Sequence, residues 1–434
     1  MNKLMLTVPV VLGLSLALAG CDNKATLTPD QQTGPDPVLP KARNFLIPPL
    51  QIPDGVGWKS GAVPDVAPGL KIEKIADGLM HPRTVYTLPN GDILVVESNS
   101  PGEEPLTAPK QIFAGYIKNL AGKGGKGGNR ITLLRKGDSG WEKHTFLENL
   151  HSPFGVQLIG DALYVSTAND ILRFPYQTGE THISAPGTVL ADLPSTVNHH
   201  WTKALQASAD GKKLFVGVGS NSNITENGQA IEYRRANVLE VDVATGASRI
   251  YASGIRNPTG LALDPESGKL WAVANERDEI GGDLVPDYMT SVQDGGFYGW
   301  PWSYFGQHVD VRVQPPRPDM VAKAIKPDYA LSSHVAPLGI MFYTGSALPQ
   351  KYHDGAFISE HGSWDREPLN GYRVNFVAFK DGKPVGKPEM VVGGFVSKDQ
   401  KSLYGAPVGL TQDKEGALII ADDVGDTVWR VTAQ

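Results

Sequence analysis

Residues 256–274 read RNPTGLALDPESGKLWAVA, and this pattern decides the fold. A short polar loop leads into an apolar strand, a turn with Gly and Asp follows, and a second apolar strand completes the unit. The same order recurs at 81–98, 152–167, 199–218, 335–359 and 405–422. Strand-like runs such as NVLEVDVATG lie between several of the copies. Six units of about four short strands predict an all-β fold, a six-bladed β-propeller whose sheets pack around a central channel.

The copies also predict how the ring closes. The copy at 405–422 is followed by DTVWRVTAQ, which gives its sheet three strands. The segment GLKIEKIADGL at 69–79 precedes the first copy and can supply the fourth strand. Joining distant segments in one sheet removes an exposed sheet edge. We therefore expect the propeller at 69–434, with its last blade closed by the N-terminal strand.

The first 68 residues predict export and anchoring. Residues 1–20 combine a lysine, an apolar run and small residues, as in a secretory signal, and LAGC at 18–21 is typical of a bacterial lipoprotein box. We expect a lipidated Cys21, a proline-rich tether over 21–68 whose later part can pack on the domain surface, and a membrane-anchored periplasmic protein. Asp22 resembles the signal that keeps some lipoproteins on the inner membrane. An uncleaved membrane anchor is the alternative, although the run Leu4–Ala19 is short for a spanning helix, which needs about 20 apolar residues.

Composition and motifs exclude several other classes of protein. The net charge is −6, so no basic excess points to a nucleic-acid partner. Cys21 is the only cysteine, so the domain beyond it can hold neither a disulfide nor a Cys-ligated zinc ion. The glycine-rich part of the insertion at 101–129 lacks the strand–loop–helix context of a phosphate loop and predicts a flexible loop. A second insertion, at 281–333, is rich in aromatic residues and predicts an ordered cap or wall near a site.

Polar residues gather at one mouth of the predicted channel. The first strand of a blade crosses from one face to the other and the second returns, so the loops before the first strand and after the second share a face. These loops carry NHHW (198–201), RN (256–257), NERDE (275–279), SEHGSWDRE (359–367) and ADDVGD (421–426). Convergent polar groups in a concavity favour a ligand site, although a single histidine can also serve only to close a turn. The pair His199–His200 would face Arg256–Asn257 of the next blade, and a neutral histidine there would suit a general base, because a nearby arginine lowers a histidine pKa and stabilises developing negative charge.

At these residues the sequence resembles the glucose/sorbosone dehydrogenase family, six-bladed propellers that use pyrroloquinoline quinone (PQQ) and calcium. The resemblance covers roughly residues 70–434 and is strongest toward the sorbosone dehydrogenase subgroup. It is carried by NHHWTKAL, GIRNPTGLALDPESGKLW, DGGFYGWPWSYFGQHVD, and HGSW with NGYRV.

The resemblance implies oxidation of an aldose or sugar aldehyde, with the downstream electron acceptor left open. His200 matches the base that takes the proton of a sugar hydroxyl as hydride passes to the quinone. Arg256 and Asn257 match the pair at the quinone oxygens, and the backbone carbonyls of Arg277 and Asp278 match the calcium ligands. A cofactor is also required on chemical grounds, because no amino-acid side chain accepts hydride and the chain has no G-x-G-x-x-G dinucleotide unit.

The sequence departs from the family where cations hold the carboxylates of the cofactor. The family has two arginines before the first strand of the last blade, where this chain reads KSLYGAPVG. It also has a lysine where this chain reads SEHGSWDR, and an aspartate where His199 stands. Losing such partners weakens the binding of an anionic group. The residues that could serve instead are His199, His361, Arg366 and Lys401.

Two other functions stay open from the sequence. A calcium-dependent sugar lactonase would need a metal held by carboxylates such as Glu97, Glu276, Asp278 and Asp422. A non-catalytic propeller would bind a protein or cell-wall partner. Three tryptophans could form a sugar-stacking wall or belong to the core: Trp300, Trp302 and Trp364.

Overall fold

The computed structural model describes residues 24–43, 51–102, 122, 124 and 127–434. The expected signal segment, Cys21 and Asp22 lie outside the described residues, as does most of the insertion at 101–129. Within the described part, no helix is both long and apolar enough to cross a membrane.

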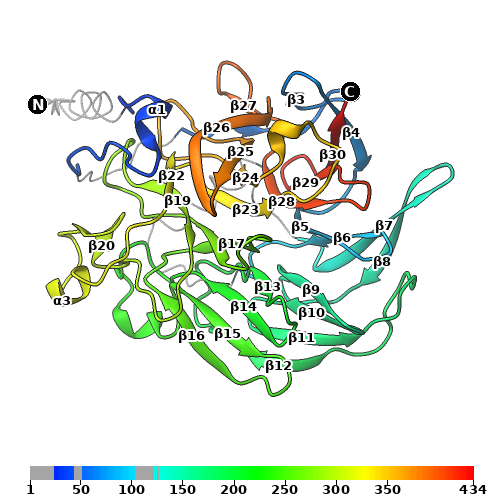
Figure 1. Cartoon of the computed structure of the whole chain (residues 1–434), viewed down its shortest axis with the longest axis horizontal. Coiled ribbons are helices and arrows are strands. Elements are labelled where there is room, and N and C mark those ends of the chain that lie inside the picture. Colours follow the sequence, from blue (N-terminus) through cyan, green and yellow to red (C-terminus); the bar gives the residue numbers. More distant parts are fainter. Residues whose placement is uncertain (1–23, 44–50, 103–121, 123, 125–126) are drawn as a thin grey trace, which may run out of the picture.

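Six antiparallel sheets stand around a central axis, which confirms the predicted all-β six-bladed propeller (Figure 1). Blade 1 contains β5 (Pro82–Thr87), β6 (Ile93–Glu97), β7 (Arg130–Gly137) and β8 (Gly140–Leu147). Blade 2 contains β9 (Val156–Ile159), β10 (Ala162–Ser166), β11 (Asp170–Pro175) and β12 (Thr188–Asp192). Blade 3 contains β13 (Leu205–Ala207), β14 (Lys213–Val218), β15 (Asn237–Asp242) and β16 (Ser248–Ser253).

Blades 4 to 6 repeat this order with additions from the N-terminal segment. Blade 4 contains β17 (Pro258–Leu263), β18 (Leu270–Ala274), β19 (Pro286–Ser291), β22 (Tyr329–Ser333) and β1 (Thr33–Gly34). Blade 5 contains β23 (Pro337–Phe342), β24 (Gly355–Glu360), β25 (Arg373–Lys380), β26 (Lys383–Gly393) and β3 (Asp65–Val66). Blade 6 contains β28 (Pro407–Gln412), β29 (Leu418–Asp422), β30 (Thr427–Ala433) and β4 (Leu70–Ala76).

The second strand of a blade explains why the sheets need one another. All five residues of β6 are buried, although a strand points alternate side chains to opposite faces. Leu94 and Val96 pack with blade 2, whereas Ile93 and Val95 pack with blade 6. The described residues form a hydrophobic cluster between each neighbouring pair of blades, so each sheet buries both faces only within the ring.

The ring closes as the sequence predicts. Strand β4 pairs antiparallel with β30, with Ile72 opposite Val431 and Leu70 opposite Ala433 (Figure 1). The two segments come from opposite ends of the sequence, so the last blade gains its fourth strand from the N-terminal side.

The segment before β4 packs on the propeller, and we call residues 24–43 and 51–66 the N-terminal strap. The sequence predicts a tether here, but Gln32, at the end of α1 (Pro29–Gln32), is buried and its Nε2 donates to Asp283 Oδ1 over 2.7 Å. Strand β2 (Asp54–Gly55) runs parallel to β27 (Ser402–Leu403). Trp58 Nε1 donates to Asp422 Oδ2 over 2.6 Å, and its ring contacts Phe395, Tyr404 and Trp429. Strand pairing and buried hydrogen bonds therefore hold the strap in place.

The insertion expected at 281–333 is shorter than predicted, because β19 and β22 within it are blade strands. The remainder, 292–328, holds the two-stranded unit β20 (Ser303–Tyr304) and β21 (His308–Val309), and α3 (Pro318–Val321). Two short helices, η1 (Gln229–Glu232) and η2 (Gln350–Tyr352), lie in other loops.

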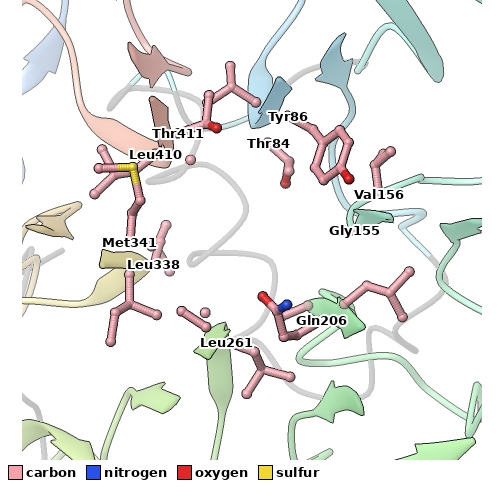
Figure 2. A pocket seen from close by; sticks show the side chains of 18 of the residues that line it. Thr84, Tyr86, Gly155, Val156, Gln206, Leu261, Leu338, Met341, Leu410 and Thr411 are labelled. Carbon is pink, nitrogen blue, oxygen red and sulfur yellow. The ribbon is translucent and has the colours of Figure 1, made fainter. Parts of the chain in front are cut away.

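A channel cavity of about 310 Å³ runs along the axis and is lined by the first strand of every blade (Figure 2). Most of its lining is apolar or neutral, as with Leu261, Leu338 and Met341. Arg83 and Phe154 line the end of the cavity that adjoins the polar mouth. The channel walls therefore carry few charged groups that could bind a polar ligand. The histidines, arginines and carboxylates that could do so lie in the loops at the mouth.

Candidate active site

His200 is joined to the next blade through Ser220. Its Nδ1 lies 2.7 Å from the carbonyl oxygen of Ser220, and the amide of Ser220 donates to the carbonyl of Arg256 over 2.8 Å. Arg235 Nη2 donates to the carbonyl of His200 over 2.7 Å. The loops of blades 3 and 4 thus meet at this point, as the repeat comparison predicts.

These contacts fix the tautomer of His200. A carbonyl oxygen only accepts, so Nδ1 carries the proton and Nε2 keeps its lone pair. Nε2 has no hydrogen-bond partner in the part of the chain that the structure describes, and the side chain stays partly exposed. Burial in the mouth, together with the positive charge of Arg256 and the neighbouring His199, holds the pKa of His200 well below its usual value. His200 is therefore a neutral base at pH 7.

The guanidinium of Arg256 donates five hydrogen bonds to neighbouring loops. It donates to the carbonyl and side-chain oxygens of Asn223, to the carbonyls of Asn275 and Glu276, and to Asp278 Oδ2, over 2.7–3.4 Å. Asn223 in turn bonds both the amide and the carbonyl of Asp278. The guanidinium is thus fixed beside His200, and it joins the loops that follow the second strands of blades 3 and 4.

Asn257 comes close to His200 across a glycine. A Cβ atom on Gly219 would lie 2.3 Å from Asn257 Oδ1 and 2.5 Å from His200 Cβ, so only glycine permits this approach. Asn257 is 5 % exposed, and its Oδ1 has no hydrogen-bond partner among the described residues. A buried acceptor without a partner costs free energy and points to a ligand or water. The structure therefore brings all three predicted catalytic residues together.

His199 stands edge to face with His200, with ring centroids 4.7 Å apart. Its backbone amide donates to Asn221 Oδ1 over 3.3 Å. This places the predicted cofactor residue His199 next to the base.

The loop expected to hold calcium through backbone carbonyls is occupied by protein donors at Asp278. Asn223 Nδ2 and Arg312 Nη1 each donate to the Asp278 carbonyl over 3.2 Å. The side chain of Arg277 is fully buried and pairs with Glu276 and Asp310. The insertion at 292–328 supplies Arg312 and Asp310, which sequence comparison could not place. The Asp278 carbonyl therefore differs from a calcium ligand open to the mouth.

The side chain of Asp278 instead faces a cluster that the sequence analysis missed. His334 Nδ1 lies 3.5 Å from Asp278 Oδ1 and 3.2 Å from Asp365 Oδ1, while its Nε2 lies 3.0 Å from the carbonyl of Gly281. Burial lowers the pKa of His334, but the carboxylates of Asp365 and Asp278 outweigh it and raise that pKa to about 10. Burial raises the pKa of Asp365 to about 7 against the opposing effect of His334. No motif marks this cluster, because the three residues come from three loops.

A second polar group lies between blades 6, 5 and 1. Asp423 accepts from Arg83 Nη1, and Asp423 Oδ1 lies 2.8 Å from His361 Nε2. The Arg83 guanidinium lies over the rings of Phe154 and Trp201, 6.0 and 5.7 Å from their centroids. His361 and Arg83 thus belong to the mouth, where the repeat pattern places the loop of Arg83, although Arg83 is not among the predicted cofactor ligands.

The other two predicted cofactor cations have different positions. Arg366 is buried and donates to the carbonyls of Gly282 and Pro368 and to Gln32, so it anchors the N-terminal strap. Lys401 is exposed, and its carbonyl accepts from the amide of Asp54 on the same strap. Among these described contacts, neither Arg366 nor Lys401 touches His200, Arg256 or Asn257.

The tryptophans divide between core and surface. Trp300 is buried and donates to the carbonyl of Asn223 over 2.9 Å, and Trp302 lies under Arg317. Trp364 is 39 % exposed and directly precedes Asp365. Only the last of the three offers an open ring face.

Most of the carboxylates considered as metal ligands for a lactonase already accept hydrogen bonds or form ion pairs within the protein. Glu97 accepts from Arg130 and Thr132, and Glu276 pairs with Arg277. Asp422 accepts from two tryptophans and two backbone amides. Of the four, only Asp278 takes part in a described cluster of possible metal ligands.

Comparison with known proteins shows which family this propeller resembles. A family model described as TrAA12-like matches residues 64–290 and 318–434. A PQQ-dependent sugar dehydrogenase of Hypocrea jecorina is 24 % identical over 375 residues, which cover 73 % of this chain and 84 % of that protein.

Two solved structures share the fold. The holo PQQ domain of pyranose dehydrogenase from Coprinopsis cinerea has a TM-score of 0.69 at 17 % identity and covers 88 % of this chain and all of that one. The calcium structure of a Trichoderma reesei carbohydrate-active enzyme of family AA12 has a TM-score of 0.69 at 20 % identity and covers 86 % of this chain and 97 % of that one. With the family match extending over both halves of the propeller, the chain belongs to the TrAA12-like family.

Proposed function

We propose that this chain oxidises an aldose or related sugar, with His200 as general base and PQQ as the electron acceptor. The observation that carries the proposal is the neutral, partly exposed His200, whose Nδ1 proton is fixed by Ser220 and whose Nε2 is left to accept a proton. The names of the relatives, a PQQ-dependent sugar dehydrogenase and a PQQ domain of a pyranose dehydrogenase, support this choice of reaction.

The mouth fits an anionic cofactor carrying hydrogen-bonding oxygens. Arg83 Nε and Asn257 Oδ1 are a buried donor and a buried acceptor with no hydrogen-bond partner among the described residues. Arg83 and Arg256 would hold such a cofactor by charge, and the imidazole of His199 lies beside His200 at the mouth. When bound, the quinone supplies the two-electron acceptor that side chains cannot provide. Arg83 thereby offers one replacement for the cations that the last blade lacks.

The chain itself handles the proton. His200 Nε2 takes the proton of the sugar hydroxyl, and the hydrogen bond from Nδ1 to Ser220 strengthens as the ring becomes positive. Arg256 disfavours a lasting imidazolium, so the proton passes on to solvent through the exposed side of the ring. Asn257, held against Gly219, orients whatever group occupies the space above the histidine.

Calcium does not fit the carbonyl of Asp278 in this arrangement, because two N–H donors already occupy that oxygen. We assign no step to calcium at that atom. The remaining part of the proposal is a periplasmic location at the membrane through a lipid on Cys21, which rests on the sequence alone.

The test is a titration of the full chain with PQQ in the presence of divalent cations, followed by a panel of aldoses and an artificial acceptor. We expect saturable binding in the quinone absorbance and sugar-dependent bleaching. His200→Gln should retain binding and lose turnover by about 100- to 10,000-fold, the usual contribution of a general base. His353→Gln is the matched control, because that histidine lies in the turn between β23 and β24, on the opposite face.

Three outcomes would contradict the proposal. Absence of quinone binding at micromolar concentration would remove the cofactor and direct attention to protein partners. Hydrolysis of gluconolactone without added cofactor would favour the lactonase. A fully active His200→Gln variant would remove the base.

A further inference from the structure

We propose that Asp278, His334 and Asp365 form a binding site for a first-row divalent metal ion such as Zn²⁺, held by side chains beside Arg256. Their nearest ligand atoms, one imidazole nitrogen and two carboxylate oxygens, all lie within 4.8 Å of one another. The site requires neither the quinone nor a sugar, so it stands independently of the proposed function.

The three ligands come from separate loops that the propeller brings together. Asp278 follows β18, His334 lies between β22 and β23, and Asp365 follows β24. Their side chains are 23 %, 4 % and 2 % exposed, respectively. The site is therefore closed on two sides and open beside Asp278, which leaves a route for an ion and a position for an exchangeable ligand.

The distances suit a small ion. Bonds from zinc to nitrogen and oxygen are about 2.0–2.2 Å, so neighbouring ligands in a tetrahedron lie about 3.3–3.6 Å apart. His334 Nδ1 is 3.2 Å from Asp365 Oδ1 and 3.5 Å from Asp278 Oδ1. The carboxylate oxygens of Asp278 and Asp365 lie within 4.8 Å of each other.

The surroundings of the ligands support a metal. His334 Nε2 lies 3.0 Å from the carbonyl of Gly281, the contact that orients most metal-binding histidines and leaves the other nitrogen for the ion. Asp365 Oδ1 is buried, has no hydrogen-bond partner among the described residues, and faces His334. Arg256 holds Oδ2 of Asp278 and leaves Oδ1 to the site.

The ligand types decide the class of metal. Calcium and magnesium take oxygen ligands, whereas imidazole favours zinc and its first-row neighbours. One nitrogen with two carboxylates therefore points away from calcium. Arg256 and His199 oppose a cation here, but two carboxylates face the site directly and Asp287 is buried close by.

The test is equilibrium dialysis of the chelator-treated full chain against Zn²⁺, and in parallel against Ca²⁺, with metal counted per chain. A Co²⁺ absorption spectrum reports nitrogen and oxygen coordination independently of activity. We expect one Zn²⁺ per chain, with affinity lowered about 10- to 100-fold or more in His334→Gln and Asp365→Asn, since even outer-sphere partners have effects of that size. Asp278→Asn, at the open side, serves if a buried variant does not fold.

Two controls locate the ion. His361→Gln changes the other buried histidine–aspartate pair of the mouth and should keep the zinc. His200→Gln excludes binding to the adjacent histidine pair. The proposal is overturned if zinc does not bind, if binding survives in the ligand variants, if it is lost in His200→Gln alone, or if calcium binds and excess zinc does not displace it.

Discussion

Replacing Gly219 by alanine should disable the site while leaving the fold intact. The added Cβ would lie 2.3 Å from Asn257 Oδ1 and 2.5 Å from His200 Cβ, about 1 Å inside the 3.4 Å at which ordinary contact begins. Gly219 does not have a positive φ, so alanine brings a steric effect without a backbone penalty. Either the base or the carboxamide must therefore move by about 1 Å, and a shift of that size can lower a rate by about 100-fold.

The assay compares kcat/KM for the sugar identified by the proposed test with the free energy of unfolding in urea. Overpacking of this kind costs about 1–3 kcal/mol, which a propeller of this size tolerates. Gly137→Ala is the control, because its Cβ would meet the flexible end of Glu142 at 3.1 Å and the carbonyl oxygen of Gly140 at an ordinary contact distance of 3.5 Å, in an outer hairpin. A Gly219→Ala protein with unchanged kcat/KM, or one whose crystal structure accommodates the methyl group without displacement, would refute the reasoning.

Two further predictions use the surroundings of the site. Arg256→Met should raise the pKa of His200, because Arg256 is one cause of its depression, and should move the acidic limb of the kcat/KM profile to higher pH; an unchanged limb would show that burial alone sets the value. Trp58→Phe should keep the ring contacts of the N-terminal strap but lose the 2.6 Å hydrogen bond to Asp422. We expect a loss of about 1–3 kcal/mol in unfolding free energy, the cost of a buried acceptor that loses a donor, and a urea midpoint equal to wild type would contradict it.

Much of the fold was readable because it is repetitive. Each blade has the same alternation of apolar strands and turns, so six weak signals reinforce one another, and the pairing of 69–79 with the last strands followed from counting strands. The mouth could be located for the same reason, since equivalent loops of a repeat share a face. The pairs His199–His200 and Arg256–Asn257 lie in equivalent positions of adjacent copies, which predicts that they share the mouth, and the family resemblance then selects His200, Arg256 and Asn257.

The rest depended on contacts between segments that no repeat relates. Asn223 and Arg312 occupy the Asp278 carbonyl, and one of them comes from the irregular insertion. His334 and Asp365 carry no spacing signal, because β23 and β24 separate them in the chain. The polar, proline-rich composition of the strap predicts a tether with only its later part packed on the domain, whereas Gln32, near its start, and Trp58 both hydrogen-bond to loop carboxylates of the propeller. The amino-acid composition of a segment indicates only its average exposure to solvent. It does not reveal individual buried hydrogen bonds such as Gln32–Asp283 and Trp58–Asp422.

The charges of the mouth give a physical reason why its loops are bound so closely to one another. Arg256 lowers the proton affinity of His200 only while it stays within reach, yet an arginine with free donors would turn toward the nearest carboxylate. Five hydrogen bonds to two loop segments remove that freedom, and Asp278, one of the acceptors, also lies 3.5 Å from His334 Nδ1. The base and the proposed metal ligands are therefore electrostatically coupled through one guanidinium, because each charge in this poorly solvated region must be balanced by a neighbour. An ion bound between Asp278 and Asp365 would weaken the hold of Asp278 on Arg256 and strengthen the effect of that arginine on His200.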